Sequence, residues 1–399
     1  METLQPGTPS GPDDQPPDPA AAGQQARRYG NARFRLSIAA AICDFAALAA
    51  FLFSGASLRL ARALPGGPAV VVLAYVTLLT LGLMLLDMPF GIWGRLIEIR
   101  FGMNRQGWGG WLWDEVKGSA LGLGLGLAAA ELVYALLRTA PHTWWLWSWA
   151  AFSLFTVVMA QLGPVLLLPL FFKLRQMSED DPREAELLRR LHATYDKLRS
   201  ENPRLPRLHG IYEWKLGAKT AKANAALTGL GGTRRVLISD TLLESSPAEE
   251  IEAVFAHELG HHVHGDIWRG IGFQGGLSLL GFWLAQRALA RFGPALGLRG
   301  VADVAGLPLL VLVFTLLGLA LMPASNGFVR AMERRADDYA FAALGSAQPL
   351  IAGLRRLAEK NLAEVDPPRW KELLLYSHPS IGTRVRRGQA WEARQRPGG

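Results

Sequence analysis

Long apolar runs, separated by polar stretches, dominate this 399-residue chain. A helix needs about 20 apolar residues to cross the hydrocarbon core of a bilayer, because each residue adds only about 1.5 Å of length. Runs of this length predict about six membrane-spanning helices, four within residues 27–173 and two within residues 174–399. These spans are expected near residues 36–54, 69–87, 118–137, 146–172, 268–289 and 304–325.

A polar stretch from 174 to 266 separates the fourth predicted span from the fifth. Residues 182–200 carry apolar side chains at helical spacing, which predicts an amphipathic helix. A further helix should begin near Ser246, a good capping residue that is followed by Pro247. Between these two helices, three short runs predict the strands of a small β-sheet: 207–213, 223–228 and 235–239.

The first 26 residues differ from the rest of the chain. Residues 1–26 are rich in Pro, Gly, Asp and Gln and contain no apolar run. Such a segment cannot bury enough apolar surface to fold, so we expect a disordered tail. A secretory signal peptide would need an apolar stretch near its start, so none is predicted.

Composition and charge agree with a membrane protein. Half of the residues are hydrophobic and only 19% are charged, against roughly 25% in soluble domains. The net charge of +8 does not indicate nucleic-acid binding, because many basic residues flank apolar runs and no basic-aromatic reading module is present. The Ala-, Gly- and Arg-rich composition is typical of bacteria, so we expect a bacterial inner (cytoplasmic) membrane. Lys and Arg concentrate in three segments that, with both termini, are therefore predicted to be cytoplasmic: 88–117, 174–266 and 327–399.

The candidate chemistry lies in the helix that follows Ser246. His257, Glu258 and His261 form the pattern H-E-x-x-H. Residues four apart lie on one helical face, so both imidazoles can reach one ion, and Glu258 points to the side where a metal-bound water would lie. Zinc lowers the pKa of such a water towards about 7, and a carboxylate can then accept its proton. Cys43 is the one cysteine and lies in an apolar run, so a metal must be held by His and carboxylate groups.

A site with two histidines needs a third protein ligand. The stretch NGFVRAMERRADDYAF, just after the sixth predicted span, offers Glu333, Asp337 and Asp338. Glu333 and Asp337 are four apart, so one can bind the metal while the other hydrogen-bonds a ligand histidine. Composition alone does not choose among the three carboxylates.

Five segments together resemble the type I CAAX prenyl endopeptidases, which are integral-membrane zinc metalloproteases, and more distantly the bacterial protease HtpX. In chain order they are IEIRFGMNRQGWGGWLWDEVKG, NAALTGLGGTRRVLISDTLL, HELGH, ERRAD and YSHPS. The resemblance runs through most of the chain after residue 90. It implies a gluzincin-type zinc protease domain in residues 174–399, with one Zn²⁺ per chain.

The resemblance also implies roles for single residues. Glu333 would be the third zinc ligand, and Asp337 would support a ligand histidine. Asn224 would hold the substrate backbone. His378 would stabilise the oxyanion of the tetrahedral intermediate, a contribution worth a few kcal/mol. Two arginines match further positions of the family and are expected to bind substrate: Arg330 and Arg384.

The chain departs from the family in two respects. Val329 stands where the family has Ser before the arginine of the third motif. About six spans are predicted here, whereas the eukaryotic members carry seven, and the difference falls near the N-terminus.

These features predict a membrane zinc endopeptidase that cuts membrane-associated or lipidated, CAAX-like substrates at the cytoplasmic face. An HtpX-like enzyme that removes misfolded membrane proteins would use the same chemistry. A multispan binding or transport protein with an incidental zinc site is a third hypothesis, which the complete set of ligands and base disfavours. A site-2-type intramembrane protease is rejected, because no Asp-Gly pair is present and the segment SSPAEEIEA is too charged for the centre of a bilayer.

Overall fold

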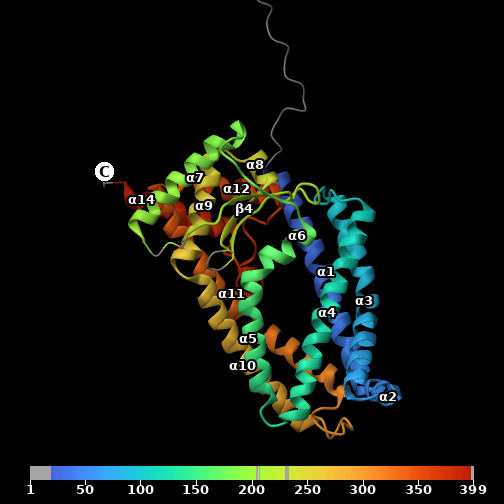
Figure 1. Ribbon diagram of the computed structural model, residues 1–399. Coiled ribbons are helices and arrows are strands. Elements are labelled where there is room, and N and C mark those ends of the chain that lie inside the picture. Colours follow the sequence, from blue (N-terminus) through green and yellow to red (C-terminus); the bar gives the residue numbers. More distant parts are fainter. Residues whose placement is uncertain (1–18, 204, 206, 230–232, 397–399) are drawn as a thin grey trace, which may run out of the picture.

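The computed structural model describes residues 19–203, 205, 207–229 and 233–396. Long helices run side by side through its lower part, and a small sheet and most of the shorter helices lie above them (Figure 1). The long helices are α1 (Pro19–Phe53), α3 (Pro68–Arg100), α4 (Trp108–Thr139), α5 (Trp144–Leu162), α10 (Asp266–Phe292) and α11 (Leu307–Leu344). The shorter helices include α2 (Ala56–Ala63), α7 (Pro182–Glu201), α8 (Asp240–Ser245), α9 (Ala248–Val263), α12 (Gln348–Lys360), α13 (Arg369–Leu375) and α14 (Ile381–Gln395).

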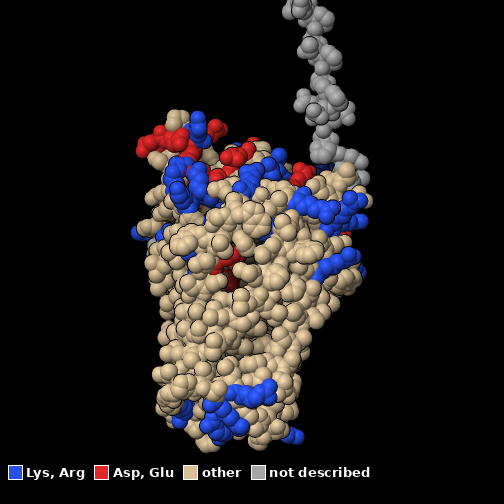
Figure 2. Space-filling model, turned by 90° about the vertical axis from the view of Figure 1, so that its right-hand side faces the viewer, with Lys and Arg blue, Asp and Glu red and all other residues tan. Residues whose placement is uncertain are grey.

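The long helices form the membrane part of the protein. α10, the fifth predicted span, packs along α5 and α11 but is too rich in glycine and polar residues to count as a span by composition. Figure 2 shows a wide uncharged belt between charged residues at the upper and lower ends. The prediction of a multispan helical membrane protein is confirmed, and the count of about six is close. Five helical segments within the described residues are long and apolar enough to cross a bilayer: Ala21–Phe53, Pro68–Arg100, Trp108–Thr139, Trp144–Phe171 and Val304–Leu344.

One predicted boundary is wrong: residues 19–26, assigned to the disordered tail, form the first turns of α1. Pro19 opens the helix, and the Ala- and Gln-rich stretch after it has high helix propensity. Residues 1–18 of the predicted tail lie outside the described residues.

The fourth predicted span is not one regular α-helix. α5 ends at Leu162 and continues through a single π-helical turn, Gly163–Leu167, into α6 (Leu168–Phe171). Pro164 and Pro169 lack the N–H groups that would continue the helical hydrogen bonds, which explains the break.

The sheet lies above the membrane helices and has four strands in the order β1-β2-β4-β3. β2 pairs in parallel with β4, whereas β1 and β3 pair antiparallel with their neighbours, so β3 forms one edge. Each predicted run overlaps a strand. β1 was not predicted, because its three residues directly follow the apolar fourth span. The strands are β1 (Leu174–Gln176), β2 (Ile211–Trp214), β3 (Ala225–Thr228) and β4 (Arg235–Ser239).

Helix α9, which carries the H-E-x-x-H pattern, packs between the sheet and α11. It begins at Ala248, slightly later than predicted. Phe255 and Leu259 on one face are buried in the core that α9 shares with α7 and the sheet. Gly260 lies against α11, where a Cβ atom would come within 3.1 Å of Ala336 Cα. The missing side chain at Gly260 therefore lets the two helices approach closely.

We expect Gly260→Leu to separate α9 from α11 and to lower the free energy of unfolding by about 2 kcal/mol or more, because overpacking a tight contact costs roughly 1–3 kcal/mol. Gly270→Leu in α10 is the control, since an added Cβ atom there meets nothing within 4 Å. Thermal unfolding in detergent measures both variants. Equal unfolding temperatures for the two would contradict the close contact.

Candidate active site

Two helices that are distant in sequence bring three candidate metal ligands together. α9 carries His257 and His261 one turn apart, and α11 carries Glu333. His257 Nε2 lies 3.5 Å from Glu333 Oε2, and His261 Nε2 lies 3.4 Å from Glu333 Oε1. A tetrahedral zinc ion with bonds of about 2.0–2.1 Å holds its ligand atoms roughly 3.3–3.4 Å apart. One ligand atom from each residue lies within 4.8 Å of the other two, so the residues fit such an ion.

The other ring nitrogen of each histidine contacts a carboxylate. His257 Nδ1 lies 3.0 Å from Asp337 Oδ1, and His261 Nδ1 lies 2.9 Å from Asp266 Oδ2. These contacts orient both rings so that Nε2 faces Glu333. Burial favours the neutral ring of His261, but its hydrogen bonds to Asp266 and Glu333 outweigh burial and raise its pKa to about 10. The carboxylates around the two histidines therefore attract positive charge, and a metal ion and a proton would compete for this position.

An arginine lies behind each of these carboxylates. Arg384 of α14 is buried and donates from Nη2 and Nε to Asp337 at 2.6 and 3.0 Å. Arg335 of α11 donates to Asp266 at 2.9 Å. Each ligand histidine is thus supported by an Asp–Arg pair. Sequence reasoning missed Arg335, because a basic residue in the run ERRADD resembles an ordinary solvated helix face.

In the structure, Arg384 and Arg330 both contact protein groups, and the substrate-binding role that the family resemblance implies stays a prediction. Arg384 is engaged with Asp337. Arg330 is also buried, and it holds the end of α13 and the loop that leads to His378 against α11. Both arginines thus hold protein groups in place. The backbone carbonyls to which Arg330 donates are those of Glu372, Leu373 and Tyr376, at 3.0, 3.1 and 2.5 Å.

Glu258 lies beside the edge strand of the sheet. Its Oε2 atom accepts a hydrogen bond of 3.1 Å from the Leu227 N–H. Leu227 belongs to β3, where it lies opposite Val236 of β4. Because this N–H is donated to Glu258, it points away from β4 and towards the open edge. The candidate base and the open edge of the sheet are therefore neighbours.

His378 reaches the metal-binding group from the loop between α13 and α14. Its Nδ1 atom lies 3.0 Å from Glu333 Oε2, and 62% of its side chain is exposed. This position is next to the ligands yet open to an incoming molecule.

Asn224 lies at the start of the edge strand. Its backbone pairs with Ser239 of β4, and its exposed side chain lines a cavity of about 500 Å³ between the sheet and the broken helix that contains Gly163–Leu167. Asn224 precedes by three residues Leu227, the partner of Glu258. The predicted substrate-binding residue Asn224 thus directly precedes the strand whose Leu227 N–H contacts the candidate base Glu258.

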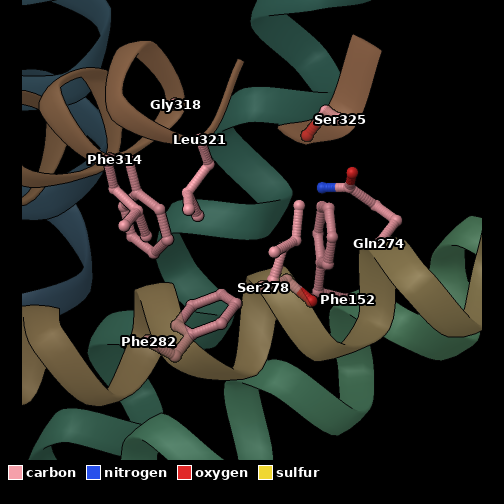
Figure 3. A pocket seen from close by; sticks show the side chains of 10 residues that line it. Phe152, Gln274, Ser278, Phe282, Phe314, Gly318, Leu321 and Ser325 are labelled. Carbon is pink, nitrogen blue, oxygen red and sulfur yellow. The ribbon is translucent and has the colours of Figure 1, made fainter. Parts of the chain in front are cut away.

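A second cavity, of about 380 Å³, lies among α5, α10 and α11 in the membrane part (Figure 3). Phe282 and Phe314 line one end, and Gln274 and Ser325 lie near each other at the opposite end. Ser325 precedes Glu333 by two turns of α11, about 12 Å along the helix axis. The polar end of this apolar cavity is therefore the end nearer to the candidate metal ligands.

An H-E-x-x-H helix with a glutamate as third candidate ligand, built onto membrane-spanning helices, defines a membrane metallopeptidase. Comparison with known families agrees. Residues 19–173 match the family described as "CAAX prenyl protease N-terminal, five membrane helices", and residues 185–392 match "Peptidase family M48". The chain belongs to peptidase family M48 and is a zinc metalloendopeptidase.

Three similar proteins span most of the chain. The Bacillus subtilis (strain 168) metalloprotease YhfN is 27% identical over 80% of this chain and 73% of its own length. A protein of Arabidopsis thaliana named CAAX prenyl protease 1 homolog is 28% identical over 75% of this chain and 69% of its own. The crystal structure of S. mikatae Ste24p superposes with a TM-score of 0.79 at 23% identity, covering 96% of this chain and 92% of that one, and shows the same fold.

We expect Asp337→Asn and Asp266→Asn each to weaken zinc binding by about 10–100-fold, because an amide supports a ligand histidine less well than a carboxylate. Zinc affinity is measured by competition with a chelator. Asp338→Asn is the matched control, because Asp338 pairs with Arg387 at 2.5 Å and not with a ligand histidine. A loss of the same size in the control would show that charge alone, and not support of the histidines, holds the metal.

Proposed function

We propose that this protein hydrolyses peptide bonds in membrane-associated proteins or peptides, with one zinc ion per chain held by His257, His261 and Glu333. The observation that carries the proposal is the spacing of the candidate ligand atoms: His257 Nε2 and His261 Nε2 lie 3.5 and 3.4 Å from the two oxygens of Glu333, close to the ligand separation around tetrahedral zinc. Three protein ligands leave a fourth position for water or substrate, as hydrolytic zinc sites require.

The chemistry divides among a few side chains. When bound, zinc would polarise the scissile carbonyl and lower the pKa of the attacking water. Glu258 accepts the proton of that water and later delivers it to the nitrogen of the leaving amine. His378, exposed beside Glu333, donates a hydrogen bond to the carbonyl oxygen as that oxygen becomes negative. Asp337 and Asp266 keep the two ligand rings in place while charge develops.

The substrate is proposed to bind as an extended chain along the edge strand β3. An added strand would use the outward backbone groups of β3, next to Glu258, and the amide of Asn224 would hold its backbone. Ala226 and Thr228 lie on the same face of the strand as Asn224, and all three line the cavity of about 500 Å³. Leucine and phenylalanine side chains of the broken helix complete its walls, so this cavity suits an apolar side chain of the substrate: Leu167, Leu168 and Phe171.

A lipidated or otherwise apolar substrate fits the cavity among α5, α10 and α11. Its walls are apolar, and its polar end lies about two helical turns from the metal ligands. A lipid attached near the scissile bond could therefore occupy it. The names of the CAAX prenyl protease relatives support a lipidated substrate.

We place the catalytic end on the cytoplasmic side of a bacterial inner membrane. The segments 88–117, 174–266 and 327–399 carry most of the Lys and Arg residues, and such residues favour the cytoplasmic side. Figure 1 shows the latter two segments, which contain α7, α9, α12 and α14, gathered at the upper end of the molecule.

We expect Glu258→Gln to abolish cleavage of a farnesylated CAAX-type peptide, by about 10³-fold or more, while zinc content stays at one ion per chain. The glutamine keeps the shape of the side chain but cannot accept the proton. Purified wild type and variant are compared in detergent, with metal content determined for both. A variant that still cuts, or a wild type that binds zinc and cuts neither this peptide nor unfolded membrane proteins, would refute the proposed function.

We expect Gly318→Phe to lower kcat/KM for the lipidated peptide by roughly tenfold, through KM, because a ring in the cavity displaces several methylene groups of a bound lipid. Gly318 lines the cavity, and an added Cβ atom meets nothing within 4 Å. Gly122→Phe in α4 is equally open and does not line the cavity. The same peptide without lipid should be cut equally by all three proteins. A loss shared by both peptides would exclude this cavity as the lipid site.

A further inference from the structure

The end of the molecule opposite the active site is rich in arginine. There α2, the start of α3, the end of α4 and the start of α11 meet, joined by hydrogen bonds from Ser57 to the Ala305 carbonyl and from Tyr134 to the Val304 carbonyl. The connecting segments 54–67, 138–143 and 287–303 contain no lysine and one acidic residue, Asp303. Their six arginines are all exposed: Arg59, Arg62, Arg138, Arg287, Arg291 and Arg299.

Three of these arginines line one cavity of about 480 Å³. Arg62 comes from α2, Arg138 from the end of α4, and Arg299 from the segment before α11. We call this cavity the arginine pocket. Asp303 also lines it, and its remaining walls are largely apolar and include Leu64, Val71, Val72 and Val304.

The positive charge of the arginine pocket is only partly balanced. Arg299 Nε lies 3.6 Å from Asp303, whose buried carboxylate also accepts the backbone N–H groups of Arg299 and Ala305. Arg138 lies 3.7 Å from Glu131. Within the described part of the chain, no ion pair or hydrogen bond of the Arg62 side chain is present. The arginine pocket thus holds more cationic than anionic groups.

The position of the arginine pocket points to a lipid. Spans begin and end around it, so it lies at the level of the membrane–water interface. Figure 2 shows Lys and Arg but no Asp or Glu at this lower end of the visible face. The preference of basic residues for one side of a membrane can explain the excess of Lys and Arg at only one of the two ends of the molecule. The excess at the other end therefore needs another explanation.

We infer that the arginine pocket binds an anionic glycerophospholipid. Guanidinium groups pair with phosphate oxygens through two parallel hydrogen bonds, and three such groups converge here from separate segments. The apolar walls receive the first part of the acyl chains, which a free phosphate or a soluble anion would not need. Basic pockets between membrane helices bind lipid headgroups in the same manner.

The test is native mass spectrometry of the full-length protein in a neutral detergent, titrated with phosphatidylglycerol or with phosphatidylcholine of the same acyl chains. We expect phosphatidylglycerol to bind at least about tenfold more tightly: both lipids carry an anionic phosphate, but the cationic ammonium of choline is repelled by the three guanidinium groups. The triple variant Arg62→Gln, Arg138→Gln and Arg299→Gln should lose this preference. The single variant Arg62→Gln, at an exposed position, should weaken it severalfold and serves if the triple variant does not fold.

The matched control replaces three arginines of the same end that do not line the arginine pocket: Arg59→Gln, Arg287→Gln and Arg291→Gln. This control should keep the preference, and phosphatidylglycerol should raise its unfolding temperature as in the wild type. Equal losses in the two triple variants would overturn the inference, because diffuse charge would then explain the binding. Competition by millimolar glycerol 3-phosphate would also overturn it, since the site would then take a soluble phosphate and not a lipid.

Discussion

The close packing of α9 on α11 is the constraint on which the catalytic centre depends. α9 carries both candidate ligand histidines and the candidate base, and α11 carries Glu333, so the proposed ligand set exists only while these two helices touch. Gly260 and Ala336 permit that approach. A metal bound between the helices would bridge them, and its binding free energy would add to the stability of the fold. Packing and metal binding therefore support each other.

The second constraint is charge neutrality behind the ligands. Asp337 and Asp266 are both nearly inaccessible to solvent, and an isolated carboxylate in such a place is costly. Each is compensated on one side by a ligand histidine and on the other by an arginine, Arg384 or Arg335. The two arginines therefore support the candidate ligands through these carboxylates, and Arg384 also lies 3.4 Å from His257 Nδ1 and 3.9 Å from Glu333 Oε2. Arg330 acts in a comparable way on the loop of His378, through backbone carbonyls.

Local pattern was enough to predict much of this structure. The bounds of α7 and β4, and the shared face of His257 and His261, follow from spacing within a few neighbouring residues. The choice of Glu333 over Asp337 and Asp338 needed the family resemblance, because only the packing of α11 decides which carboxylate faces α9.

Other features depended on contacts that no local pattern contains. Arg384 and its partner Asp337 are 47 residues apart, and Arg335 and Asp266 are 69 apart. Sequence spacing carries no sign of such pairs. Pro164 and Pro169 indicate a break in the fourth span, but the continuous apolar character of that stretch led to the prediction of a single span. α10 shows the opposite case, since its place beside α5 and α11 and not its composition makes it part of the membrane bundle.

Helix α11 rises by nearly the thickness of a bilayer between its start and Glu333. It starts at Leu307, among the far ends of the spans, and reaches Glu333 after 26 residue steps, a rise of about 39 Å. A bilayer with its headgroups is about 40–45 Å thick. A helix that rises by this amount along the bilayer normal would carry Glu333 to the height of the near headgroups, where a peptide bond held close to the membrane would reach it most readily. Substrates would then be selected by the height of the scissile bond above the membrane before the residues around that bond are recognised.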